Sequence, residues 1–291
     1  MFHFIKRRKI FYVISILAML PGLISLALQG LNLGIDFTSG SILEIRFEKA
    51  VQVEQVRETV KNEGFEASRI QQSGDRDFLI RTTKLTQSDS QKLMDSFTGK
   101  MGKVELLRNE YVDPIISTEL FWRALGALAI ASVLMVIYIT FRFEFKQGIA
   151  AIVALLHDTL LVIGIFSLFR IEVDSAFIAA ILTIIGYSIN DTIIIFDRIR
   201  ENLRMQKKGQ SLEDLVNLSI WQTLARSINT VLTVMFVLLA LYFLGGATVK
   251  TFVLAMIIGV ASGAYSSIFN ASPIWVDLRL MDKKGNSKAM A

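Results

Sequence analysis

Six long apolar runs divide this chain, and each is long enough to cross a lipid bilayer as a helix. They cover residues 10–28, 121–141, 149–169, 176–196, 227–245 and 251–274. Between the first two runs, residues 31–118 show short apolar stretches mixed with Gly, Ser, Asp and Gln, which is typical of a water-soluble domain. The sequence therefore predicts a polytopic α-helical membrane protein with six transmembrane helices and one α+β domain between spans 1 and 2.

The soluble segment switches between the periodicity of strands and that of helices. The expected elements are a strand at 41–48, a helix at 53–61, strands at 67–72 and 78–83 around a turn at 73–75, a helix that begins at Thr86 or Ser88, and a strand at 104–112. This β-α-β-β-α-β order predicts a ferredoxin-like domain with both helices on one sheet face. The expected core residues are Leu43, Ile45, Phe47, Val56, Val60, Phe78, Ile80, Leu93 and Phe97.

Basic residues lie beside alternate spans, and this distribution sets the expected topology. The formal net charge is +5, but residues 32–118 carry 12 Lys/Arg against 14 Asp/Glu, so the excess lies in short segments that flank the apolar runs. Such clustering argues against nucleic-acid binding. We expect a cytoplasmic N-terminus (1–9), an uncleaved transmembrane helix (10–30), an extracytoplasmic ferredoxin-like domain (31–118), a membrane domain with helices 2–6 (119–275) and a cytoplasmic tail (276–291).

The fourth span contains an ionisable group where hydrocarbon is expected. Thr183, Tyr187, Asn190 and Asp191 recur at helical spacing on one face, whereas isoleucines cover most of the rest. A carboxyl inside the membrane costs a few kcal/mol even on lenient scales, so it predicts an ion or proton pathway, or a buried partner. The alternative is a protonated, hydrogen-bonded residue that only holds helices together.

Other polar positions extend this hypothesis. Arg226, Asn229, Thr230 and Thr233 form a stripe on the fifth span, at a depth similar to that of Asp191, although Arg226 can instead anchor the span at the lipid head groups. His157-Asp158 in the third span is either part of a relay or, preferably, a satisfied structural pair. Ser211-x-x-Asp214 predicts a capped helix along the inner surface or in solvent. Gly259 and Gly263 are spaced for close helix packing.

Composition excludes several kinds of chemistry. The chain has no cysteine, so thiolate catalysis and cysteine-ligated metals are excluded, and a metal site built from His3 and His157 is not expected. Neither a nucleotide-binding glycine loop nor a catalytic triad is visible in the sequence. We therefore expect no cofactor, no metal and no enzymatic activity.

Three stretches make the chain resemble the SecD/SecF family of the bacterial protein-export machinery. They are residues 33–40 after the first span, residues 180–192 and residues 196–202. The matching residues include Gly34, Asp36, Phe37, Gly40, Gly186, Asp197, Arg198, Arg200, Glu201 and Asn202. The family usually has glycine where Ser39 stands.

The resemblance implies membership of the resistance-nodulation-division superfamily, in which proton movement through the membrane half drives motion of the external half. By position, Asp191 and Arg226 match residues assigned to the family's proton path, with Asn190, Tyr187, Asn229 and Thr230 as neighbouring polar groups. It also implies SecD as a partner, association with SecYEG and YajC, contact with the translocating polypeptide, and a location in the bacterial cytoplasmic (inner) membrane.

Two rival functions stay open at this point. One is a half-size proton-driven exporter of small molecules or lipids, which would want a larger external domain with a substrate cleft. The other is a structural clamp that stabilises the translocon without proton flux. The polar stripe around Asp191 favours an accessory export subunit that uses the proton gradient over the clamp.

Overall fold

The computed structural model describes residues 2–65, 67–73, 75–82, 85–142 and 144–289. The chain forms two compact units, each with its own hydrophobic core. The sheet unit is Leu33–Leu125, and the membrane unit combines Met1–Asn32 with Gly126–Ala291.

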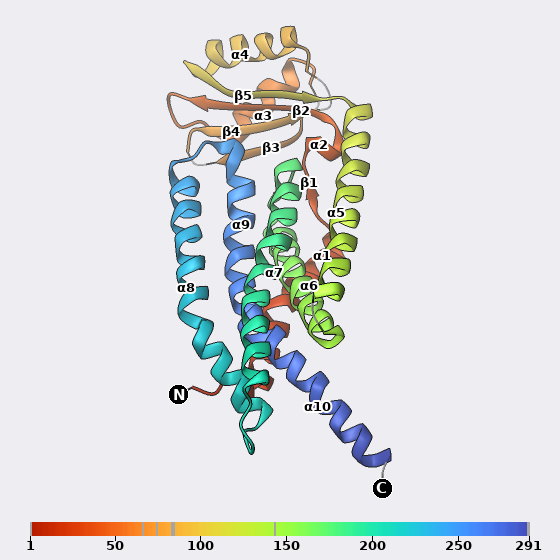
Figure 1. Ribbon diagram of the computed structural model, residues 1–291. Helices are drawn as coiled ribbons and strands as arrows, with labels where there is room; N and C mark the ends of the chain where they lie inside the picture. The colour runs from red at the N-terminus through yellow and green to blue at the C-terminus, as the bar shows by residue number, and fades with distance from the viewer. Residues whose placement is uncertain (1, 66, 74, 83–84, 143, 290–291) are drawn as a thin grey trace. The chain divides into compact units, whose positions relative to one another are not determined.

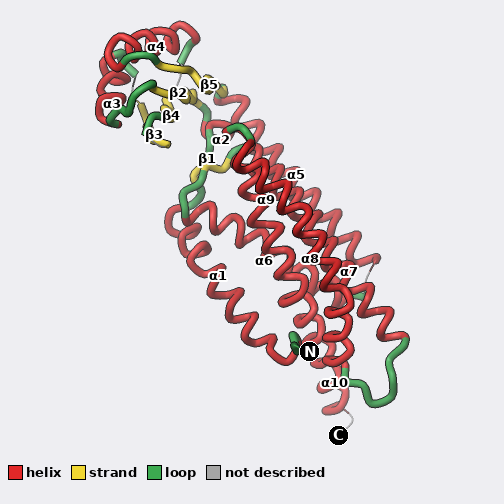
Figure 2. The backbone as a smooth tube through the Cα atoms, turned by 90° about the vertical axis from the view of Figure 1, so that its left-hand side faces the viewer, coloured by secondary structure: helices red, strands yellow, loops and turns green. Residues whose placement is uncertain are grey.

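The sheet unit has the predicted β-α-β-β-α-β order. After the short helix α2 (Ile35–Thr38) come β2 (Gly40–Phe47), α3 (Val53–Asn62), β3 (Ala67–Ser73), β4 (Asp77–Thr82), α4 (Gln87–Met101) and β5 (Val104–Val112). The strand order is β3-β4-β2-β5, and every neighbouring pair is antiparallel. Helices α3 and α4 lie next to each other against one face of the sheet (Figure 2). This is the ferredoxin-like arrangement that the sequence predicts.

The core of the sheet unit consists of alternate strand residues packed against valines and leucines of the two helices. All nine residues predicted for this core are buried there. Thr86, rather than Ser88, caps α4: its hydroxyl accepts from the backbone N–H of Asp89, and the Asp89 carboxylate accepts from the backbone N–H of Thr86. Gly74 and Thr83, which belong to the predicted hairpin, lie outside the described residues.

Six helices among the described residues are long and apolar enough to cross a membrane, as predicted. The membrane unit contains α1 (Arg8–Gln29), the end of α5 (Pro114–Arg142), α6 (Phe145–Leu168), α7 (Ser175–Arg204), α8 (Leu212–Leu244), α9 (Ala247–Ser266) and α10 (Ser272–Ala289). Strands β1 (Asn32–Leu33) and β6 (Glu172–Val173) are short. Helices α6, α7 and α9 pack against one another, α8 contacts α7 and α9, and α1 packs on α6 (Figure 1).

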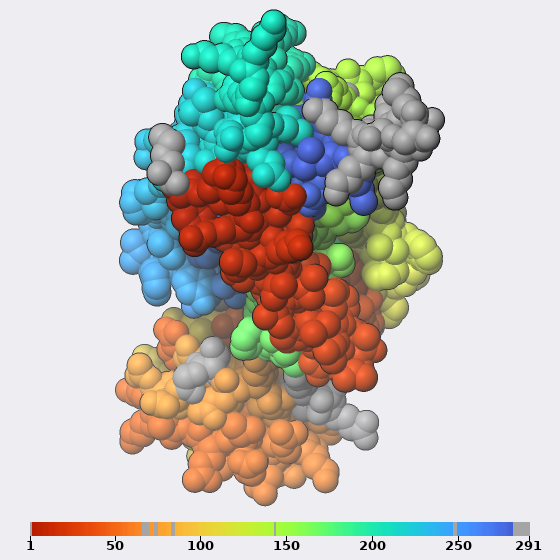
Figure 3. All heavy atoms as spheres, turned by 90° about the horizontal axis from the view of Figure 1, so that it is seen from below, coloured from red at the N-terminus to blue at the C-terminus, as the bar shows by residue number. Residues whose placement is uncertain are grey.

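Helix α8 differs from the expectation of a separate helix along the inner surface. Ser211 caps it as predicted, with its hydroxyl accepting from the backbone N–H of Asp214 at 3.1 Å. The helix then runs without interruption to Leu244, because residues 212–244 contain neither glycine nor proline. Its first turns are not left to solvent. Leu215 and Ile220 are buried, and the chain start packs there (Figure 3).

The chain start is fixed to α8 by specific contacts. The amide oxygen of Asn217 accepts from the backbone N–H of Phe4 at 2.8 Å, and the Trp221 indole donates to the carbonyl of Phe2 at 2.9 Å. Arg8 pairs with Glu213 at 2.9 Å. The basic start of the chain therefore lies at the same end of the membrane unit as the start of α8.

Helices α7 and α9 approach closely at glycines. A Cβ atom on Gly263 would lie 3.1 Å from the Cβ of Ser188, and one on Gly259 would lie 2.3 Å from Ile184 Cδ1. The predicted close packing at both glycines is thus confirmed, with α7 as the neighbouring helix. Past this contact a π-helical turn, Ser267–Ala271, joins α9 to α10. Such turns are common at functional sites in membrane and soluble helices.

Candidate functional site in the membrane unit

Asp191 is a buried carboxyl on α7 without hydrogen-bond partners in the described part of the chain. Its residue is 1% exposed, and neither side-chain oxygen has a partner there. The residues before and after it along the buried face, Ser188, Ile195 and Phe196, belong to the interior of the unit. An unpaired buried carboxylate would be very costly, so this group is stable as a neutral acid or with a partner supplied from elsewhere.

The polar stripe on α7 crosses the edge between the buried and exposed sides of the helix. Thr183 and Asn190 are exposed, Tyr187 is half-buried, and Asp191 is buried. The Tyr187 hydroxyl donates to the backbone carbonyl of Thr230 on α8 at 3.3 Å. Gly186 is exposed, with open space where a Cβ would lie. Helix α7 therefore offers a polar edge next to Asp191.

Arg226 on α8 is exposed and forms no direct ion pair with Asp191 among the described residues. The two residues do interact electrostatically through space. Asn229 is exposed and Thr230 is half-buried on the same stripe, where Thr230 donates to the Arg226 carbonyl at 2.8 Å. Asp191 and Arg226 are therefore not in direct contact in this part of the chain.

A polar pocket of about 410 Å³ separates α7 from α8. Asn190, Asp197 and Glu201 line it from α7, and Gln222 and Arg226 line it from α8. Asp191, which follows Asn190, is not part of the lining. The pocket therefore places polar groups of α7 and α8 beside the residue that precedes Asp191.

The run of charged and amide residues at the end of α7, residues 197–202, forms a network of ion pairs and hydrogen bonds. A guanidinium nitrogen of Arg142 on α5 lies 3.2 Å from each carboxylate oxygen of Asp197, and Arg200 lies 3.4 Å from Asp197. Arg198 pairs with Glu201 at 2.9 Å. The Asn202 amide donates to Ser219 and Gln222 of α8, both at 2.8 Å. These residues tie α5, α7 and α8 together beside the pocket.

The motif after the first span, residues 33–40, lies in the sheet unit. The carbonyl of Gly34 begins the one-turn helix α2 by accepting from the amides of Phe37 and Thr38. The Phe37 ring contacts Phe121 edge-on, with centroids 6.1 Å apart, and Asp36 lies in the first turn of α2. Ser39 has φ 62° and ψ 172°, and Gly40 has φ 113°. Both positions favour glycine.

A second buried carboxyl, Asp158 on α6, is more completely bonded than the sequence suggested. His157 Nδ1 lies 3.0 Å from Asp158 Oδ1, which confirms the predicted pair. Three serine hydroxyls also donate to Asp158, from Ser188 on α7 and from Ser262 and Ser266 on α9, each at 2.6 Å. Sequence reasoning missed these serines because single serines in apolar helices carry no distinctive pattern, and only helix packing brings them together.

The chain combines a ferredoxin-like unit after its first helix with six helices that are long and apolar enough to cross a membrane. One of these helices carries a buried carboxyl that has no hydrogen-bond partner among the described residues. These features define the class: a multi-pass membrane protein with a buried acidic residue in a candidate span. The family model described as "Protein export membrane protein SecD/SecF, C-terminal" matches residues 92–281, and that of the "SecD/SecF GG Motif" matches residues 24–51. The chain belongs to the SecD/SecF family.

Relatives support this assignment over the whole chain. A protein translocase subunit SecF of Thermobaculum terrenum is 42% identical over 297 residues, which cover 95% of this chain and 93% of that protein. A protein translocase subunit SecDF of Bacillus subtilis is 39% identical over 289 residues, which cover 98% of this chain but 39% of that protein. The two relatives therefore differ in how much sequence lies outside the shared region.

A solved structure has the same fold. The crystal structure of SecDF from Thermus thermophilus, described as a translocon-associated membrane protein, matches with a TM-score of 0.87 at 37% identity. The match covers 96% of this chain and 38% of that one. A structure of SecDF in a super-membrane-facing form matches with a TM-score of 0.72 at 32% identity. The chain thus spans well under half the length of the solved SecDF chains.

Proposed function

We propose that this chain is an accessory subunit of the Sec protein-export machinery that works with SecD and uses the proton gradient to promote late stages of polypeptide translocation across the cytoplasmic membrane. The names of its relatives, protein translocase subunits SecF and SecDF, support the export role. One observation carries the proton-driven part: Asp191, buried in a membrane helix, has no hydrogen-bond partner for either carboxylate oxygen among the described residues.

Asp191 acts as the protonation switch. A group that gains and loses a proton must have two states of comparable free energy, and a carboxyl fully satisfied by fixed donors would be held in its charged form. The polar pocket beside Asn190 supplies the route for the proton, and Arg226 of α8 lines the same pocket. Tyr187, Asn229 and Thr230 continue the polar edge.

Protonation changes which packing of α7 and α8 is favoured. Deprotonated Asp191 attracts Arg226 and draws the two helices together, and this attraction disappears when the proton binds. The family-motif residues Asp197 and Asn202 fix the end of α7 to α5 and α8, so the movement concentrates at Asp191. The sheet unit follows through its covalent links to α1 and α5.

The exposed polar edge of α7 and α8 supports SecD as the partner. Thr183, Asn190, Arg226 and Asn229 are exposed within membrane helices, where lipid would leave such groups poorly solvated. A second membrane protein, or water held between the two, has to cover them. SecDF relatives, in which the matched region is 39% of a longer protein, are consistent with SecD in that place. SecYEG, YajC and the emerging polypeptide complete the proposed assembly.

The proposed orientation puts both termini in the cytoplasm and the sheet unit outside. Basic residues at the end of α5, on α10 and at the start of α1 form ion pairs at one end of the membrane unit: Arg142 with Asp197, Arg279 with Glu144, and Arg8 with Glu213. Positively charged connections stay on the cytoplasmic side of bacterial membranes. This supports the inner membrane as the location.

The test is export of a preprotein into vesicles that contain the complete translocon with SecD, with and without an imposed proton gradient. Asp191→Asn keeps the size of the side chain but cannot ionise, so we expect the gradient to stop stimulating export while SecD still co-purifies. Arg226→Ala should weaken the stimulation, and the matched Arg226→Lys, which keeps the charge, should retain most of it. Full stimulation with Asp191→Asn would leave the structural clamp as the better account.

A further inference from the structure

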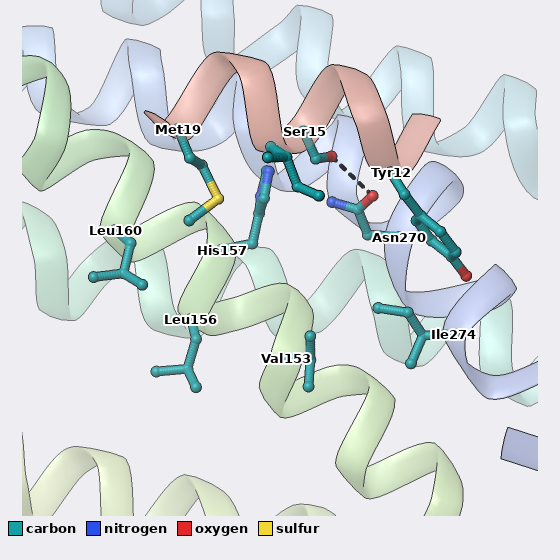
Figure 4. Close-up of a pocket in the computed structure, with 10 residues that line it drawn as sticks. Tyr12, Ser15, Met19, Val153, Leu156, His157, Leu160, Asn270 and Ile274 are labelled. Atoms are coloured by element: carbon teal, nitrogen blue, oxygen red, sulfur yellow. Dashed lines mark hydrogen bonds between the residues drawn. The ribbon is translucent and has the colours of Figure 1, made fainter. Parts of the chain in front are cut away.

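Helix α1 is fixed to its neighbours near both ends and leaves a cavity between these contacts. Near its start, Arg8 pairs with Asp277 of α10 at 2.7 Å, and the Tyr12 hydroxyl donates to the same carboxylate at 3.0 Å. Further along, Gly22 meets Gly164 of α6, where an added Cβ would lie 2.7 Å from the Gly164 backbone. Between these contacts lies the α1 cavity, a space of about 500 Å³ between α1, α6 and the α9–α10 junction (Figure 4).

The walls of the α1 cavity are mainly hydrocarbon, and its mouth is apolar too. Most of the surface comes from Ile16 and Met19 of α1 and from Val153, Leu156 and Leu160 of α6. Three of these side chains are well exposed: Ile16 by 61%, Leu156 by 54% and Val153 by 43%. Since α1 and α6 both have the length and apolarity of membrane spans, the opening between them faces lipid or another membrane protein.

The polar residues beside the α1 cavity make their contacts within the protein. Ser15 donates to Asn270 at 3.0 Å, and Nδ1 of His157 lies 3.0 Å from an oxygen of Asp158. Tyr12 donates to α10, as described above. Apolar cavities exclude water and accept apolar ligands, and about 500 Å³ lies within the range of known ligand sites. The lining therefore fits a hydrocarbon chain and not a polar solute.

The α1 cavity has the length and position of a lipid chain in one leaflet. Its lining on α1 begins at Tyr12 and ends at Met19, which corresponds to about 10 Å of helix. Met19 lies at the middle of α1 (Arg8–Gln29), and each leaflet contributes about 15 Å of hydrocarbon. A lipid with its headgroup at the start of α1 would therefore place a chain along the cavity.

The start of α1 presents an exposed positive charge on the cavity side. Arg8 and Lys9 precede Tyr12 by four and three residues, so both lie on the helical face that lines the cavity. The charge of Arg8 is compensated by Glu213 and Asp277. Lys9 is exposed and forms no ion pair within the described part of the chain. A lysine at the membrane surface attracts anionic lipid headgroups.

We propose that the α1 cavity binds one acyl chain of an anionic phospholipid and that Lys9 binds the phosphate of its headgroup. Hydrocarbon contact alone would not select a lipid, because chains in the bilayer already lie in an apolar medium. Selection comes from the charge of Lys9 and from the shape of the cavity. The bound chain fills the space between the two contacts of α1 and stabilises the position of this helix.

The size of the α1 cavity favours a lipid chain over a helix of a partner protein. A helix is about 10 Å across with its side chains, so even a segment about 10 Å long has a larger volume than the space available. An extended acyl chain is much thinner and can enter along the cavity from the bilayer. Charge and size thus point to the same occupant.

Occupancy is tested with the full chain in phosphatidylcholine vesicles that contain a small fraction of phosphatidylglycerol with a photoreactive diazirine on one acyl chain. After irradiation, we expect the label within residues 12–19 of α1 and 153–160 of α6. Ile16→Trp fills the cavity mouth and should abolish this labelling. Leu17→Trp is the matched control, because Leu17 is also 61% exposed but does not line the cavity. Label spread evenly over the exposed helices, or equal labelling of the two variants, would overturn the proposal.

The headgroup is tested by competition in the same vesicles. Unlabelled phosphatidylglycerol should displace the photoreactive lipid more effectively than phosphatidylcholine with identical chains. Lys9→Gln should weaken displacement by phosphatidylglycerol about five-fold, the effect of one basic group at an anionic surface. Lys207→Gln removes the same charge from the α7–α8 connection and should have no effect. Equal displacement by the two lipids, or equal effects of the two variants, contradicts a role for Lys9.

The same labelling, repeated on the chain co-purified with SecD, distinguishes a lipid from a protein occupant. Labelling of residues 12–19 that persists in the complex supports the lipid site. Labelling that disappears when SecD is bound would show that a partner covers the cavity and would overturn the lipid assignment. These experiments use no proton gradient, so their outcome is independent of the export test with Asp191→Asn.

Discussion

A close approach of two helices in the membrane unit is a contact between glycines, and it supports a quantitative prediction. Helix α1 meets α6 at Gly22 and Gly164. A Cβ placed on Gly22 would lie 2.7 Å from both the Cα and the carbonyl carbon of Gly164. Nonbonded carbon atoms approach to about 3.5–4.0 Å. Because the obstacle is backbone and not a side chain that can rotate, Gly22→Ala forces the helices apart by about 1 Å.

This separation should cost stability in two ways. Overpacking of a close contact costs about 1–3 kcal/mol. One turn further along, the hydroxyls of Ser25 and Ser167 are 2.8 Å apart, and the Gln29 amide donates to the carbonyl of Ser167 at 3.2 Å. Moving the helices apart by about 1 Å takes such contacts beyond hydrogen-bond range. With about 2–4 °C in Tm for each kcal/mol in a chain of this size, Gly22→Ala should lower Tm by roughly 2–12 °C.

The assay is thermal unfolding of the purified chain in detergent, followed by tryptophan fluorescence, since the absence of cysteine rules out thiol-reactive dyes. Gly126→Ala on α5 is the matched control, because nothing lies within 4 Å of the added methyl group. Its Tm should stay constant or rise slightly, as alanine favours helix. Ser167→Ala should cost less in the Gly22→Ala background than alone. Equal Tm values for Gly22→Ala and Gly126→Ala would refute the close contact.

Three further predictions concern the sheet unit and the topology. Ser39→Gly should raise Tm and Ser39→Ala should not, since φ 62° with ψ 172° is a conformation that costs residues other than glycine about 1–3 kcal/mol; equal effects of the two would contradict this strain. Thr86→Ala should cost about 1 kcal/mol of stability. The hydrogen bonds from Thr86 lower the pKa of Asp89, so ionised Asp89 stabilises the fold above its usual pKa and loses this effect on acidification. The loss of stability caused by Thr86→Ala should therefore shrink below about pH 4. Cysteines at Lys92 and Lys207 should label oppositely with an impermeant reagent in intact spheroplasts, and equal labelling would contradict the proposed orientation.

Most of the fold was predictable because its signals are local. Span length and apolarity gave six helices, and the change from period two to helical spacing gave the sheet unit down to all nine core residues. Helix α8 was misjudged because a capping signal at Ser211 marks where a helix begins and says nothing of where it ends. No glycine or proline lies between Ser211 and the fifth span, and the lack of such a stop signal indicates that the helix continues into the span.

The charged residues of the candidate sites were the ones that could be predicted from the sequence. An aspartate in an apolar run is conspicuous, so Asp191 and Asp158 were both visible in the sequence. Their environments were not, because hydroxyl donors such as Ser262 and Ser266 are common in membrane helices and acquire a role only through packing. The Gly22–Gly164 contact escaped for the same reason: two glycines that are distant in sequence meet only in the folded chain.

The two buried carboxyls have opposite surroundings, and this contrast divides their roles. Asp158 accepts from three serine hydroxyls and lies 3.0 Å from Nδ1 of His157, so all of these contacts come from its own chain. Asp191 has none among the described residues, so its charged form depends on whatever occupies the polar edge of α7 and α8. A group whose ionisation depends on a partner is the one through which that partner can sense a proton. Under the proposed function, Asp191 therefore responds to the partner that covers this polar edge, whereas the contacts of Asp158 join α6, α7 and α9 within the chain.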